Sequence, residues 1–119
     1  MDLLRKLAVL FGVVFLVVGI AGYVPAWVTD GNLFGIFMVD SVHNIVHILS
    51  GAVALYASTR ADYARLFFKV FGVIYAVVAV LGFVGGDHYL MTHFNMADNI
   101  LHLVIAVVAL YLGFVFRRE

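Results

Sequence analysis

The sequence predicts an all-α integral membrane protein, a bundle of four transmembrane helices built from two parallel two-helix repeats. Three observations lead to this prediction: a strongly apolar composition, a division of the charged residues into two groups, and a repeat that relates the two halves. Of the 119 residues, 66% are hydrophobic and only 12% are charged. A soluble domain has about 25% charged residues. We therefore expect residues 1–119 to form a single domain within a membrane.

Four apolar stretches are long enough to cross a bilayer. A hydrocarbon core of about 30 Å requires about 20 apolar helical residues. The first stretch follows Arg5 and Lys6, as the core of a secretory signal would. It is longer than a usual signal core and has no small-x-small cleavage site, so we interpret it as a retained span. The four expected spans cover about residues 7–28, 41–59, 66–84 and 98–116.

The charged residues indicate how these spans are oriented. All seven basic residues lie near the chain ends or in the middle connection, whereas all five histidines lie in or beside the other two connections. Basic residues that lie close to span ends in short loops favour the cytoplasmic side. We therefore predict an inner-membrane protein, surrounded by the lipid bilayer, with both termini in the cytoplasm and the histidines toward the outer side.

A repeat relates the second span to the fourth. The segment Asp40–His47 matches Asn95–His102 at a constant offset of 55 residues. Each repeat holds two spans, an even number, so both copies enter the membrane from the same side. Matched residues should then lie at equal depth and face each other across an axis along the membrane normal. Small residues below the histidines, including Gly51 and Ala106, predict a close seam between spans two and four.

Polar side chains should gather where the second and fourth spans begin. His43 and His47 are four residues apart, as are Asp98 and His102, and residues at this spacing share a helical face. Three imidazoles and one carboxylate are a plausible ligand set for zinc, or for iron at an open site. The sequence thus predicts a metal site at the outer ends of two helices.

Composition limits what this site could bind. The chain has no cysteine, which excludes thiolate-bound zinc, iron–sulfur clusters and covalently attached haem. We predict a transition-metal ion, zinc first, bound without catalysis, because no nucleophile, acid or base stands apart from the cluster. Asn44 and Asn99 are expected to support the ligands by hydrogen bonds. The zero formal net charge gives no argument for a nucleic-acid partner.

Two other interpretations stay open. The histidines and asparagines could simply join helices by hydrogen bonds, in a structural or assembly protein whose partner is a second copy or another membrane protein. Alternatively, His47 and His102 could be the two axial ligands of haem b in an electron carrier. His88 and His93, in the connection before the fourth span, are interpreted as solvated loop residues.

Particular motifs resemble those of a known family. At Phe34–Phe37 and at His43–His47 the chain resembles a bacterial family of small four-helix membrane proteins, catalogued only as a domain of unknown function. It is similar again at Asp98–His102 and at Ala109–Phe114, so the resemblance extends over nearly the whole chain. Met38 departs from the family by replacing an expected proline before the second span. The resemblance implies a four-span bundle and brings no established activity.

Overall fold

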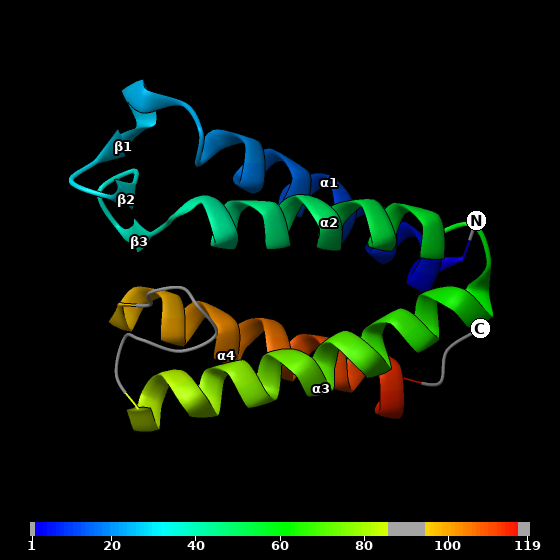
Figure 1. Cartoon of the computed structure of the whole chain (residues 1–119). Helices are drawn as coiled ribbons and strands as arrows, with labels where there is room; N and C mark the ends of the chain where they lie inside the picture. Colours follow the sequence, from blue (N-terminus) through cyan, green and yellow to red (C-terminus); the bar gives the residue numbers. More distant parts are fainter. Residues whose placement is uncertain (1, 86–94, 117–119) are drawn as a thin grey trace.

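Two helical hairpins make up most of the structure, a computed structural model that describes residues 2–85 and 95–116. The N-terminal hairpin consists of α1 (Leu3–Ala21) and α2 (Ser41–Ala57). The C-terminal hairpin consists of α3 (Ala61–Gly85) and α4 (Met96–Leu110), and a π-helical turn over Tyr111–Val115 extends α4. Figure 1 shows the two hairpins side by side, with the start of α1 and the π-helical turn after α4 at the same end of the molecule.

Three of the helical segments are long and apolar enough to cross a membrane. They cover Leu3–Ala21, Ala61–Val84 and Met96–Val115. Helix α2 is also apolar but shorter, with 17 residues. Large aliphatic side chains such as Leu10 and Val107 are more than half exposed on the outer surface. Such a surface suits the hydrocarbon of a bilayer, so the chain has the character of a membrane protein.

Helix α1 ends earlier than hydropathy suggested. It stops at Ala21, whereas the apolar stretch continues to residue 28. Pro25 begins a 3₁₀ turn over Pro25–Trp27, and the residue before it, Val24, has an extended backbone. Proline disfavours the helical conformation of the residue that precedes it. The apolar residues beyond Ala21 therefore belong to the connection between α1 and α2.

This connection contains a small antiparallel sheet, which departs from the strictly all-α prediction. The strands are β1 (Val28–Thr29), β2 (Asn32–Leu33) and β3 (Phe37–Met38), in the order β1-β2-β3. Asp30 and Gly31 join the first two strands with φ values of 52° and 81°. Positive φ at both residues defines the type I′ turn that suits a two-residue hairpin, and Asp-Gly is a favoured sequence for it.

Glycines set the close contact of the helices within each hairpin. In α1, Gly12 lies against the Gly51 carbonyl oxygen and the Leu55 side chain. In α3, Gly72 lies against Leu110 of α4. Gly51 therefore faces α1, and not α4 as the expected seam between spans two and four required. Small residues allow such close helix contact wherever they meet a neighbour.

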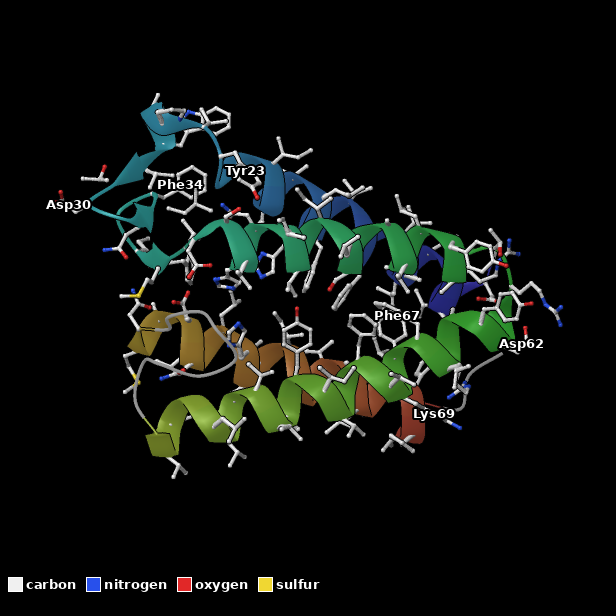
Figure 2. All side chains as sticks on the ribbon, viewed as in Figure 1. Tyr23, Asp30, Phe34, Asp62, Phe67 and Lys69 are labelled. Carbon is white, nitrogen blue, oxygen red and sulfur yellow. The ribbon has the colours of Figure 1, made fainter. Side chains whose placement is uncertain are left out.

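Aromatic side chains fill much of the space between the two hairpins. Phe11 of α1 lies with its ring centroid 5.3 Å from Phe67 and 5.9 Å from Phe68 of α3. Phe15 packs edge-on against Tyr75 farther along α3, with the two ring centroids 5.9 Å apart. Figure 2 shows Phe67 among the side chains between the hairpins. The core of the molecule therefore lies at the junction of the hairpins.

Candidate metal centre

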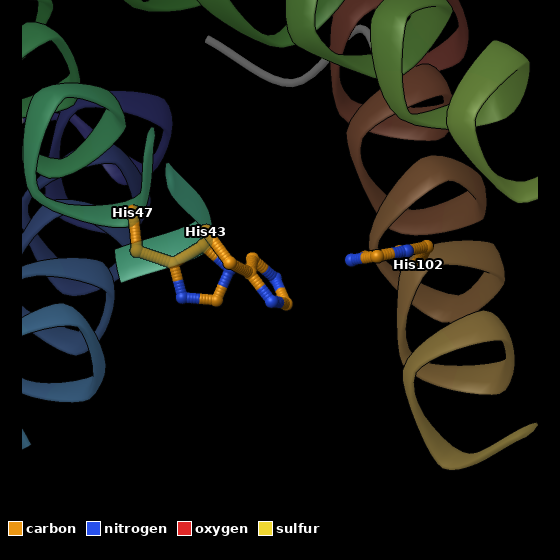
Figure 3. A group of neighbouring side chains, drawn as sticks. All are labelled: His43, His47 and His102. Carbon is orange, nitrogen blue, oxygen red and sulfur yellow. The ribbon is translucent and has the colours of Figure 1, made fainter. Parts of the chain in front are cut away.

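Two helix N-termini carry the histidine group, which consists of His43, His47 and His102. The α2 helix begins after Asp40, whose Oδ1 accepts a hydrogen bond of 2.8 Å from the His43 backbone N–H. This cap places His43 and His47 on successive turns of one face. The matching start of α4 places His102 on the opposite hairpin. Figure 3 shows the rings of His43 and His47 reaching from α2 toward His102.

The three rings lie close together and are buried. One potential ligand atom from each histidine lies within 4.8 Å of the others. Each residue is at most 5% exposed. Nitrogens bound to one tetrahedral zinc at about 2.0–2.1 Å stand about 3.3 Å apart. Small movements of the rings would therefore bring all three onto one ion.

A backbone contact orients the His43 ring. Its Nδ1 lies 3.1 Å from the Met38 carbonyl oxygen. A carbonyl oxygen only accepts hydrogen bonds, so Nδ1 carries the proton and donates it. In the neutral ring Nε2 then keeps its lone pair, as a metal ligand requires. Metal-binding histidines commonly donate their second N–H to such a carbonyl.

Aromatic rings surround the other two histidines. The ring centroids of Phe15 and His47 lie 5.1 Å apart, and those of Tyr75 and His102 lie 5.6 Å apart. His47 Nε2 is buried, and no residue within 2–85 or 95–116 gives it a hydrogen bond. Tyr75 is itself buried but was not expected at the site from the sequence, because only its hydroxyl distinguishes it from the phenylalanines of the same span.

Asp98 was expected among the ligands, and its contacts give it a different role. Its Oδ2 accepts hydrogen bonds from the backbone N–H groups of Asn95, at 3.0 Å, and Met38, at 3.1 Å. The first bond completes a capping box with Asn95. Within the described part of the chain, the group whose ligand atoms lie mutually within 4.8 Å consists of the three histidines. Asp98 thus ties β3 to the start of α4.

Asn44 and Asn99, expected to support the ligands, lie at the helix contacts within the hairpins. The Asn44 carboxamide packs against Gly22, and that of Asn99 packs against Gly82. Asn99 Nδ2 also donates a hydrogen bond of 3.2 Å to the Gly82 carbonyl oxygen. These contacts join each asparagine to the neighbouring helix of its own hairpin. His88 and His93 lie outside the described residues.

The fold and this site define a class: an apolar helical protein of membrane type with three buried histidines that could hold a metal ion. A family model described as "Domain of unknown function (DUF4383)" matches residues 5–115. The match covers most of the chain, so the chain belongs to this family. Comparisons with curated proteins and with solved structures gave no match.

Proposed function

We propose that the protein binds a transition-metal ion, zinc first, through His43, His47 and His102, and that it does so without catalysis. One observation carries the proposal: three buried imidazoles from two different hairpins converge within 4.8 Å. Buried ionisable groups within a membrane span are rare and mark function. An ion held there would join the hairpins at the end where the histidines lie.

The ligand set favours zinc but admits related ions. Imidazole nitrogen suits zinc, copper, nickel and iron, and geometry decides among them. Three protein ligands leave a fourth position of a tetrahedral zinc open. A water molecule or an external ligand would fill that position, because Asp98 is not among the residues whose ligand atoms lie within 4.8 Å of one another.

The proposed setting is a bacterial inner membrane with four spans and both termini in the cytoplasm. Helix α2 measures about 25 Å along its axis, so it nearly crosses the hydrocarbon core. Basic residues gather at the end opposite the histidines: Arg5 Nε donates to the Ser58 carbonyl oxygen at 2.7 Å, and Arg65 Nη1 donates to that of Phe116 at 2.7 Å. This separation supports the orientation because basic residues favour the cytoplasmic side.

Equivalent contacts support the proposed repeat. Gly22 meets Asn44 in the first hairpin as Gly82 meets Asn99 in the second. Gly12 and Leu55 likewise correspond to Gly72 and Leu110. Two halves that use the same pairs of residues at the same places are what a duplicated two-helix unit would produce.

The haem b alternative receives less support. A planar macrocycle between His47 and His102 would need open space bounded by both residues. The cavity that reaches His43 and His47 is not lined by His102. An assembly protein, in which the histidines only pack, remains the interpretation that the zinc experiment must separate from metal binding.

Zinc titration of chelator-treated protein, purified in mild detergent without a polyhistidine tag, tests the proposal. We expect one zinc per chain, with affinity at least about tenfold weaker in His102→Ala because a direct ligand is lost. Tyr75→Phe is the matched control: it alters a buried ring beside His102 yet should bind zinc as the wild type does. Equal binding by wild type and His102→Ala would place the zinc elsewhere and contradict the proposal.

A further inference from the structure

A cavity of about 430 Å³ lies between α1 and α4 and forms a groove along the two helices. Small-molecule sites commonly measure about 300–1,000 Å³. Along α1 the lining extends from Leu7 to Val18, about 16 Å at 1.5 Å per residue. Val14 of α1 and Val104 of α4 line the groove and are about half exposed. The groove therefore opens sideways, toward the lipid around the helices.

The 22–40 connection covers the end of the groove near the histidines. Leu33 and Phe37 line this end, and Leu33 is buried. Two hydrogen bonds fasten the connection to α4 of the other hairpin. Asn95 Nδ2 donates to the Ile36 carbonyl oxygen at 2.8 Å, and the Met38 backbone N–H donates to Asp98. A molecule in the groove would thus have one end enclosed beneath this connection.

Apolar atoms form nearly all of the groove surface, and the few polar residues lie at the enclosed end. All lining residues are apolar except His43, His47 and Asp98. Asp98 Oδ2 accepts hydrogen bonds from two backbone N–H groups. The lining holds no lysine or arginine, so the groove offers no basic partner for an anionic ligand. His47 Nε2 is buried without a hydrogen-bond partner in the described part of the chain. A buried polar atom of this kind favours a ligand that supplies the missing hydrogen bond.

We propose that the groove binds a lipid-soluble molecule of the quinone class, with its ring at His47 and its hydrocarbon tail between α1 and α4. A neutral imidazole can donate to a quinone oxygen or accept from a quinol hydroxyl. Phe15 and Phe37 line the groove near the ring position and offer aromatic contacts. The charged head of a phospholipid has to stay at the water interface, so it does not fit beneath the connection.

This inference concerns the same histidine layer as the proposed metal site, but it rests on the groove and on His47. The two proposals differ at His102, which belongs to the histidine group but does not line the groove. His102→Ala should therefore lose zinc and keep the quinone. Chelator-treated wild-type protein should also bind the quinone.

Native mass spectrometry of chelator-treated protein with decyl-benzoquinone tests the groove. Val14→Trp should weaken binding of this probe at least tenfold because the indole fills the groove. Val13→Trp is the matched control: Val13 and Val14 are both 46% exposed, but Val13 does not line the groove. Equal binding by the two variants would overturn the proposal, whatever the result for zinc.

A second comparison tests the recognition of the ring. The wild type should bind decyl-benzoquinone at least tenfold more tightly than decylbenzene, which has the same tail and no oxygen. His47→Phe should remove this preference while still binding decylbenzene, which also shows that the variant is folded. Equal binding of both probes by the wild type would overturn the assignment of a quinone.

Discussion

Asn44 and Asn99 occupy spaces that exist only because Gly22 and Gly82 have no side chain. A Cβ added to either glycine would overlap the Oδ1 atom of the facing asparagine. The carboxamides therefore pack against these glycines, and Asn99 donates a hydrogen bond to the Gly82 carbonyl oxygen. Each pair fixes the contact of two helices at the depth of the histidine group.

Alanine at Gly22 should therefore loosen the N-terminal hairpin. We expect Gly22→Ala to lower the free energy of unfolding by about 1–3 kcal/mol, as overpacking of a tight contact does. Thermal unfolding in detergent measures the change. Gly82→Ala should behave alike in the C-terminal hairpin, and Val17→Ala, at an exposed position of α1, should change little.

The double variant Gly22→Ala/Asn44→Ala checks the cause of this loss. Removing the carboxamide makes room for the new methyl group, so the two losses should not add. Fully additive losses would show that the glycine and the asparagine act independently, and would contradict the assigned contact.

At single residues, the sequence predicted the histidine group better than its surroundings. The spacing of His43 and His47, and the repeat that matches His47 to His102, correctly brought three imidazoles together. Asp98 shared the same spacing, yet its carboxylate serves the helix cap and the Met38 N–H. Sequence spacing alone does not distinguish a carboxylate that caps a helix from one that binds a metal, because both roles place the carboxylate on the first turn of the helix.

The connection between α1 and α2 acts as a bridge between the hairpins. Asn95 joins the cap of α4 to this bridge, since its Oδ1 accepts a hydrogen bond of 2.9 Å from the Asp98 N–H and its Nδ2 donates to the Ile36 carbonyl oxygen. Asp40 caps α2 in the corresponding place, where its Oδ1 accepts a hydrogen bond from the His43 backbone N–H. The two caps have similar local roles, and Asn95 adds a bond from α4 to the bridge.

Asn95→Ala should remove the hydrogen bond between α4 and the Ile36 carbonyl oxygen, and it should also fray the start of α4. We expect a loss of about 1 kcal/mol for the missing cap and faster amide hydrogen exchange at residues 36–38. Asp40→Ala is the matched control, with a similar loss of stability but faster exchange confined to the start of α2. Unchanged exchange at residues 36–38 in Asn95→Ala would show that the bridge is held by other contacts.

The helices were easier to predict than this connection. Hydropathy located the helices, but it extended the first span to residue 28 because the residues after Ala21 are also apolar. Strands of two residues are too short to show an alternating pattern. The Asp30-Gly31 pair was the available signal for the turn. Thr29 and Asn32 flank this turn and pair with each other, and this pairing is recognised only once the turn has been assigned.

Across the described part of the molecule, basic residues and histidines lie toward opposite ends of the helices. The proposed orientation places Asp30 outside the cell and Asp62 inside. The chain has no cysteine, so one introduced thiol reports its own location without background. Asp30 is exposed in the connection between α1 and α2, and Asp62 is exposed in the first turn of α3.

A membrane-impermeant thiol reagent should label Asp30→Cys in intact spheroplasts. It should label Asp62→Cys only after the membrane is made permeable, because the reagent cannot reach the cytoplasmic side. Labelling of both variants in intact spheroplasts, or of Asp62→Cys alone, would contradict the proposed orientation.

The three histidines are the only side chains of their type in the described residues, and the two hairpins bring them together. The most direct measurement is the metal content of protein purified in mild detergent without chelator or a polyhistidine tag. The wild type should carry close to one zinc per chain, and His47→Ala/His102→Ala should carry none while remaining helical. Wild-type protein that is folded and carries no transition metal would contradict the central claim and leave the histidines as helix contacts.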